Sequence, residues 1–174
     1  MPAIFTIGHS THPIEEFVRL LQAHSVEQLI DIRTVPRSRT NPQFNRDTLP
    51  NSLKAAGIGY LHMPALGGLR HPRVDSPNTA WRNASFRGYA DYMQTAEFAA
   101  AIDRLVELGS QTQVAIMCAE AVPWRCHRSL VADALFARGI PVEDIMSAGR
   151  RQPHKLTPFA KVEQTRVWYP GLLA

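Results

Sequence analysis

The chain has 174 residues, of which 45% are hydrophobic and 20% are charged, a composition that is typical of one globular domain with a substantial core. No apolar run approaches the roughly 20 residues that a membrane helix needs, and the first residues lack the basic segment of a secretory signal. We therefore expect a cytoplasmic protein with no membrane partner.

The formal net charge is +4, carried by 16 Arg and only 3 Lys. This bias toward Arg has two explanations. A GC-rich genome produces it without any functional reason, or the forked guanidinium groups hold carboxylates or phosphates. A net charge of this size permits an anionic partner but does not require a nucleic acid.

Short apolar runs alternate with amphipathic stretches, a pattern that predicts strands separated by helices. Strands are expected at 4–7, 29–32, 58–62, 113–117 and 142–146. Helices are expected after Pro13, between Asp47 and Gly57, and at 86–93, 98–107 and 128–138. The sequence thus predicts an α/β fold: a single three-layer domain over residues 1–149, with a mainly parallel sheet and helices on both faces. Residues 150–174 are expected to form a basic tail packed on this domain.

Polar residues stand where three of the predicted strands end. These residues are Gly8-His9-Ser10, Asp31-Ile32-Arg33 and Cys118-Ala119-Glu120. Ligands of open α/β sheets bind at the carboxyl ends of the strands, so these segments are expected to share one site. The long loop at 64–85, with Gly67-Gly68, is of a length that is often functional or mobile.

The densest cluster of reactive side chains runs from Cys118 to Ser129. A buried strand delivers the Cys118 thiol to its end, and a loop leads into a helix that starts near His127-Arg128. Free N–H groups at a helix start attract anions and favour a thiolate, and Arg125 and Arg128 would add to both effects. The alternative is that Cys118 belongs to the core, Glu120 pairs with Arg128, and Cys126 has no role.

Asp31 lies within an apolar strand, where a carboxylate must be paired or hydrogen-bonded. Arg33 points to the same face two residues later, so the two residues form either a structural ion pair or part of an anion clamp with Arg37 and Arg39. His9 has the same two interpretations, as a residue that orders its loop by a hydrogen bond or as part of the site.

The two cysteines are expected to be reduced, with Cys126 in the loop more accessible than Cys118 at the strand end. The spacing Cys-x7-Cys-His is not that of a zinc site, and we expect neither a metal nor a cofactor. Of the two, Cys118 is the candidate for nucleophilic or redox chemistry.

Several motifs resemble the DUF488 family, a domain of unknown function. They are Thr6–Ser10, Asp31–Arg39, Leu66-Gly67-Gly68-Leu69-Arg70 and Cys118-Ala119-Glu120 with Cys126-His127-Arg128, and the resemblance extends over about residues 4–148. It implies an α/β fold and a site at these motifs. The layout is also similar to rhodanese-type domains, although arginines follow Cys118 after seven and ten residues, where those domains have a shorter loop.

The predicted catalytic residues are Cys118, Glu120 and His127, and the predicted substrate-binding residues are His9, Ser10, Asp31, Arg33, Arg37, Arg39 and Arg128. The first hypothesis is an enzyme or ligand-binding domain for a small anionic, phosphate-like or nucleotide-like substrate. The second is a nucleic-acid-associated protein that uses its Arg-rich loops, and the third is a binding domain without catalysis. The oligomeric state is left open.

Overall fold

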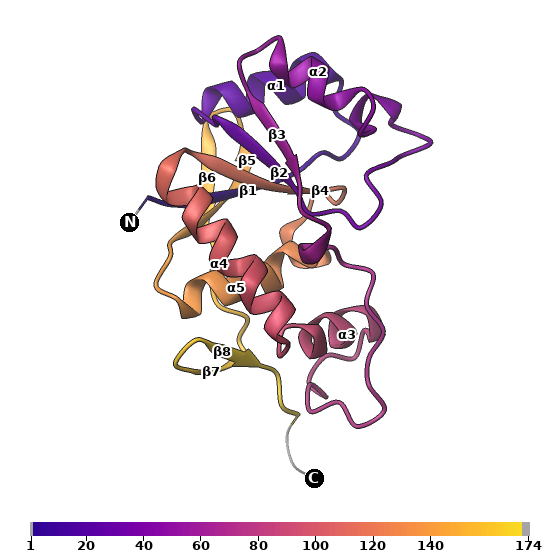
Figure 1. Ribbon diagram of the computed structural model, residues 1–174, viewed down its shortest axis with the longest axis vertical. Coiled ribbons are helices and arrows are strands. Elements are labelled where there is room, and N and C mark those ends of the chain that lie inside the picture. Colours follow the sequence, from indigo (N-terminus) through magenta and orange to yellow (C-terminus); the bar gives the residue numbers. More distant parts are fainter. Residues whose placement is uncertain (1, 172–174) are drawn as a thin grey trace.

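The computed structural model describes residues 2–171 and has a central six-stranded sheet in the order β3-β2-β4-β1-β5-β6 (Figure 1). The strands are β1 (Ile4–Gly8), β2 (Gln28–Asp31), β3 (Gly59–His62), β4 (Val114–Cys118), β5 (Val142–Ser147) and β6 (Arg150–Pro153). The first five are parallel, and β6 is antiparallel to β5 at the edge. The predicted α/β class with a mainly parallel sheet is confirmed.

Helices cover both faces of the sheet, with α1 (Ile14–Ala23) and α2 (Leu49–Lys54) on one face and three helices on the other (Figure 1). Those three are α3 (Ala84–Tyr92), α4 (Ala96–Gln111) and α5 (Arg128–Ala137). Successive side chains of a strand point to opposite faces, so Leu29 joins the core under α1 whereas Ile30 joins the core under α4 and α5. This alternation produces two separate apolar cores.

The segment after residue 149 contains strands that the sequence analysis missed. β6 pairs with β5, so the expected division at residue 149 falls between two paired strands. β7 (Lys161–Glu163) and β8 (Arg166–Trp168) form a small hairpin, and Val167 of β8 packs into the core on the α5 side. Alternating polar residues of short edge strands carry little hydrophobic signal, which is why the pattern did not reveal them.

Three boundaries of two expected helices can be compared with the structure. Gly57 and Gly139 end α2 and α5 with positive φ angles of 75° and 74°, as the sequence predicts for glycine after a helix. Asp47, with which the expected helix begins, does not cap it: Thr48 occupies the N-cap of α2, and its side chain makes no capping hydrogen bond.

The loop from residue 64 to α3 is held in place by one buried carboxylate. Asp91 of α3 accepts hydrogen bonds from the Arg73 backbone N–H (2.8 Å), the Asn78 amide (2.7 Å) and the Ser76 hydroxyl (2.5 Å). Three short helical turns also interrupt the loops: η2 (Pro64–Leu66) at the start of this loop, and η1 (Pro42–Phe44) and η3 (Pro123–Arg125) in other loops. These anchors fix the segments that surround the ends of the strands.

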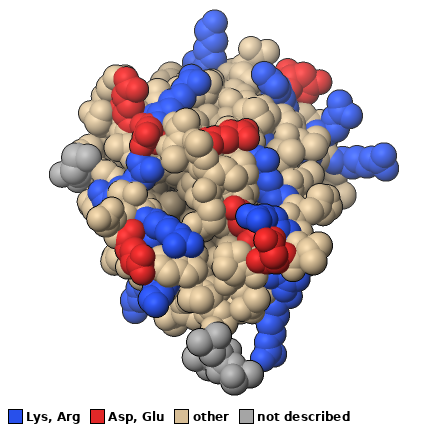
Figure 2. All heavy atoms as spheres, turned by 60° about the horizontal axis from the view of Figure 1, so that its bottom comes forward, with Lys and Arg blue, Asp and Glu red and all other residues tan. Residues whose placement is uncertain are grey.

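None of the helices described is both long and apolar enough to cross a membrane. On the face seen in Figure 2, Lys and Arg side chains lie among Asp and Glu side chains, so positive charge is spread over this face.

Candidate functional site

The ends of β1, β2 and β4 meet at one edge of the sheet, as the strand-end rule predicts. The register continues past the strands, since the backbone N–H groups of His9 and Ser10 donate to the carbonyls of Cys118 and Ala119, each at 2.9 Å. A pocket of about 360 Å³ opens beside these ends. It is lined by Arg33, Thr34, Val35, Arg37, Gly68, Leu69, Ser85, Phe86, Cys118, Ala119, Glu120, Arg125, Cys126 and His127.

Asp31 and Arg33 form a buried, saturated ion pair. Asp31 accepts from Arg33 Nε (2.9 Å), from Arg33 Nη2 (2.7 Å) and from the Arg33 backbone N–H (3.1 Å). The Tyr60 hydroxyl donates to the same carboxylate at 2.5 Å, and Arg33 Nη2 also reaches the Phe44 carbonyl at 2.6 Å. The structural ion pair that the sequence allowed is therefore present, and Asp31 neutralises most of the positive charge of Arg33.

His9 is packed against this pair. Its ring stacks on Phe44, with 4.3 Å between ring centroids. Nδ1 lies 2.8 Å from the Ser10 carbonyl and Nε2 lies 3.4 Å from Arg33 Nη1, which fits a neutral ring that donates at Nδ1 and accepts at Nε2. Burial, assisted by the charge of Arg33, lowers the pKa of His9 to about 4. His9 is thus neutral at pH 7 and orders the end of β1.

Arg128, the first residue of α5, is a buried cation of a different kind. Its Nη1 donates to Cys118 Sγ at 2.9 Å and to the Glu120 carbonyl at 2.6 Å, and its Nη2 donates to the Ala121 carbonyl at 3.1 Å. Within residues 2–171, no carboxylate lies within 4.0 Å of its guanidinium and its buried Nε has no hydrogen-bond partner.

Burial lowers the pKa of Arg128 to about 10, and the more distant charges of Asp144 and Glu120 oppose that shift. The group stays charged at neutral pH. The ion pair between the Glu120 side chain and Arg128, which the sequence analysis left open as an alternative, is not formed: Glu120 accepts from Arg128 through its backbone carbonyl, and its side chain is exposed. The guanidinium lies behind Cys118 and is not among the groups that line the pocket.

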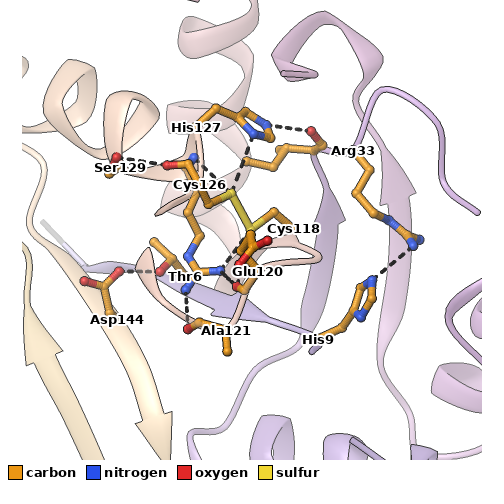
Figure 3. Close-up of a disulfide and its surroundings, with 12 residues drawn as sticks. Thr6, His9, Arg33, Cys118, Glu120, Ala121, Cys126, His127, Ser129 and Asp144 are labelled. Atoms are coloured by element: carbon orange, nitrogen blue, oxygen red, sulfur yellow. Dashed lines mark hydrogen bonds between the residues drawn. A yellow bond between two sulfur atoms is a disulfide. The ribbon is translucent and has the colours of Figure 1, made fainter. Parts of the chain in front are cut away.

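Cys118 and Cys126 are joined by a disulfide (Figure 3). The prediction of two reduced thiols is therefore wrong for this structure. Cys126 is the more exposed of the two cysteines, as predicted, but both are buried: the exposed fraction is 5% for Cys126 and 2% for Cys118. The reason lies in the loop between them, where the η3 turn at Pro123–Arg125 folds the chain back so that residue 126 returns to the end of β4. Both cysteines still contribute to the wall of the pocket.

His127 lies between the disulfide and β2. Its Nε2 is 2.9 Å from the Ile32 carbonyl, and its Nδ1 is 3.6 Å from Cys126 Sγ. Because a carbonyl only accepts, the neutral ring carries its proton on Nε2 and leaves Nδ1 as an acceptor toward the sulfur. Burial lowers the pKa of His127 to about 4. Gly68 allows this ring position, because a Cβ there would lie 2.6 Å from Nδ1.

The predicted site residues are brought together only in part. Cys118, Glu120, His127, Arg33 and Arg37 line the pocket. The remaining predicted residues do not line it: His9, Asp31 and Arg128 are buried behind it, and Ser10 and Arg39 lie elsewhere at the strand ends and in the 34–41 loop. Ser85 and Phe86 also line the pocket and were not expected there, whereas Gly68 and Leu69 belong to the Leu66–Arg70 motif at which the family resemblance implied a site.

Among residues 2–171, no group of three His, Cys, Asp or Glu side chains is arranged to hold a metal ion. In the comparisons with known proteins, residues 13–135 match the family model described as Domain of unknown function DUF488. The chain belongs to the DUF488 family. The matched segment is shorter than the extent expected from the motifs and leaves Thr6–Ser10 outside. No curated protein and no solved structure matches the chain.

Proposed function

We propose that this DUF488 protein is an enzyme that binds a small anionic substrate in the strand-end pocket and attacks it with the thiolate of Cys118. The observation that carries this proposal is the 2.9 Å contact between Arg128 Nη1 and Cys118 Sγ. A buried guanidinium without a carboxylate partner is stabilised by any negative charge beside it, and the reduced Cys118 sulfur supplies one.

Two further guanidiniums support an anionic substrate. Arg37 and Arg125 are exposed at the pocket, and neither makes an ion pair within residues 2–171. Guanidinium groups bind phosphate and carboxylate oxygens in a bidentate manner. Glu120 is the one carboxylate among the residues that line the pocket. The balance of charge at the pocket is therefore positive.

The predicted acid–base residues have separate roles in this proposal. His127 is neutral near pH 7 and offers Nδ1 as a proton acceptor beside the sulfurs. Glu120 is exposed at the pocket and can exchange protons with solvent and with the leaving group. Arg33, held by Asp31, forms a rigid part of the wall and is no longer proposed as a free anion-binding group.

The test uses the reduced protein with Cys126→Ser, so that Cys118 is the only thiol. The rate of alkylation by iodoacetamide is followed by intact mass from about pH 5 to about pH 9, a range that brackets the ordinary cysteine pKa of about 8.5. We expect alkylation to persist at least about one pH unit below that of a free cysteine. Inorganic phosphate or a mononucleotide, compared with sodium chloride at equal ionic strength, should slow it.

Substitution of the two exposed arginines of the pocket, Arg37→Ala with Arg125→Ala, should remove the protection by phosphate. Arg39→Ala is the matched control, because Arg39 is exposed in the same loop as Arg37 but does not line the pocket. An ordinary cysteine pH profile together with protection by phosphate would favour a binding domain without catalysis. An ordinary profile with no effect of phosphate would overturn the proposal. The nucleic-acid hypothesis stays a prediction.

A further inference from the structure

We infer that Cys118 and Cys126 are a redox-active pair that exchanges disulfides with small anionic thiols, with Cys118 as the attacking residue and Cys126 as the resolving residue. This inference rests on the proposed function, because it uses the same pocket and the same nucleophile. It adds the substrate class and gives a catalytic role to Cys126, which the sequence analysis left without one.

The first support is that both sulfurs face one pocket. Cys118 ends β4 and Cys126 lies eight residues later, and the η3 turn brings the two into a disulfide. Both residues line the pocket that also exposes Arg37 and Arg125. A ligand in this pocket can therefore present its carboxylates to these guanidiniums and its sulfur atoms to the cysteine pair.

The second support is that the two sulfurs have different neighbours (Figure 3). Cys118 Sγ receives the Nη1–H of Arg128 at 2.9 Å, which brings a full positive charge. Cys126 Sγ receives the backbone N–H of Arg128 at 3.4 Å, at the first turn of α5, and faces Nδ1 of His127 at 3.6 Å. In the reduced protein the full positive charge of Arg128 stabilises the thiolate of Cys118. Cys126 keeps its proton and lies next to a base, His127.

The exchange can be written as two balanced steps. The Cys118 thiolate attacks one sulfur of a disulfide RSSR, the S–S bond breaks, a mixed disulfide forms at Cys118, and RS⁻ leaves. The Cys126 thiol then gives its proton to His127 Nδ1 and attacks Cys118 Sγ, so that the second RS⁻ leaves and takes up that proton. The protein loses two electrons and RSSR gains them, and the reverse reaction with two RSH molecules restores the dithiol.

The charge of Arg128 also affects the equilibrium between the dithiol and disulfide forms of the protein. In the disulfide form the guanidinium has only carbonyls and a neutral sulfur as partners, whereas in the reduced form it lies beside a thiolate. A group that stabilises the reduced state makes the disulfide more oxidising. Arg128→Met should change the equilibrium constant at least tenfold in favour of the disulfide. This corresponds to a change of about 30 mV in the reduction potential, measured in a redox buffer. Arg128→Lys keeps the charge and should shift it less.

The deciding experiment mixes the reduced protein with three small disulfides of different charge: dithiodiglycolate, which is anionic, hydroxyethyl disulfide, which is neutral, and cystamine, which is cationic. Samples are quenched by alkylation and analysed by intact mass. The wild type should be oxidised by dithiodiglycolate at least tenfold faster than by cystamine and should end as the internal disulfide without an adduct. Arg37→Ala with Arg125→Ala should remove the charge preference.

Cys126→Ser should react with dithiodiglycolate at a similar rate but stop at the mixed disulfide on Cys118, because no second thiol resolves it. Release of both thiol halves by this variant, or a lasting adduct on the wild type, would overturn the resolving role while leaving the reactive Cys118 intact. No adduct on Cys126→Ser would mean that Cys118 is not the nucleophile, and the proposed function itself would then fail.

Discussion

Two arginines are buried at neighbouring strand ends of this sheet, and they differ in what neutralises them. Arg33 lies against Asp31, which it contacts through two side-chain nitrogens and its backbone N–H. Arg128 has two backbone carbonyls and the Cys118 sulfur, and its Nε has no partner within residues 2–171. A saturated pair is a structural element, whereas a buried cation without a counter-charge is a place where negative charge is stabilised.

Asp133 is another buried charge, and unlike Arg128 it is fully supplied with hydrogen-bond partners. Asp133 accepts from His154 Nε2 (2.7 Å), from the Thr157 backbone N–H (3.1 Å) and from the Tyr169 hydroxyl (2.7 Å). This network fixes the segment after β6 against α5, and none of its three side chains lines the strand-end pocket. Burial of a charge is therefore not by itself a sign of function in this protein. A buried charge that lacks a counter-charge and lies next to a pocket is such a sign.

The largest expected effect comes from making the same substitution at both arginines of the disulfide-bonded protein. Arg33→Met leaves the Asp31 carboxylate buried without its cation, which should lower the free energy of unfolding by about 3–5 kcal/mol. Arg128→Met removes a charge that has no counter-ion and leaves two carbonyls without donors, so we expect a smaller loss of about 1–3 kcal/mol. Urea unfolding of both variants in parallel measures the two values.

If Arg128→Met lowers the free energy of unfolding more than Arg33→Met does, the proposed difference between the two arginines is wrong. The carbonyls and the sulfur would then compensate Arg128 better than a carboxylate compensates Arg33. Tyr60→Phe serves as a control of moderate size. It removes one hydrogen bond to Asp31 and keeps the ion pair, so its cost should lie below that of Arg33→Met.

The partner of Arg33 could be predicted from the sequence, whereas the surroundings of Arg128 could not. Residues two apart at a strand end share a face, so the pairing of Asp31 with Arg33 followed from their spacing. The direction of Arg128 did not follow, because the first residue of a helix can point to solvent, to a pocket or to the core. Its actual direction depends on the path of the 119–125 loop, which contains no periodic pattern.

The disulfide was missed for the same reason. The proline at the start of η3 indicated a turn, but whether a turn brings Cys126 back to Cys118 depends on backbone angles that the residue types leave open. The strands and helices of the central domain were predicted within a few residues because each buries an apolar face. The strands β6, β7 and β8 were missed because they are short, largely polar and lie at edges.

A smaller effect is expected at the contact between the 64–85 loop and the Arg128 side of the site. In Gly68→Ala the new Cβ would lie 2.6 Å from Nδ1 and 2.8 Å from Cγ of His127, so the ring must move away from its place beside Cys126. We expect a loss of about 1–3 kcal/mol in the free energy of unfolding. The resolving step of disulfide exchange should also slow.

Gly149→Ala is the matched control for this change, because nothing lies within 4 Å of a Cβ at that position. It should be neutral or stabilise the protein by up to about 1 kcal/mol. If both glycine variants unfold at the same urea concentration, the close packing of Gly68 on His127 would be refuted, and with it the part of the site that depends on the position of this ring.

The last expected effect is the pH dependence that two histidines add, one beside each arginine. Burial lowers the pKa of His9 and of His127 to about 4, and the nearby charges of Arg33 and Arg128, respectively, act in the same direction. Between about pH 4 and about pH 6.5, the unfolded chain therefore binds protons that the folded chain does not. Stability should rise with pH through this window and be lost as the pH falls, by at most about 1.4 kcal/mol per pH unit for each histidine.

Denaturant unfolding at several pH values, with His9→Gln, His127→Gln and the exposed His71→Gln as control, separates the two contributions. The first two variants should each reduce the dependence of stability on pH, and the control should not.

Reduction of the disulfide gives a further test of the difference between the two arginines. A thiolate at Cys118 would offset the charge of Arg128 and raise the pKa of His127, so the His127 contribution should shrink in the reduced protein. The His9 contribution should stay constant, because Asp31 compensates Arg33 in both redox states. Equal changes at both histidines on reduction would show that the two arginines are compensated alike.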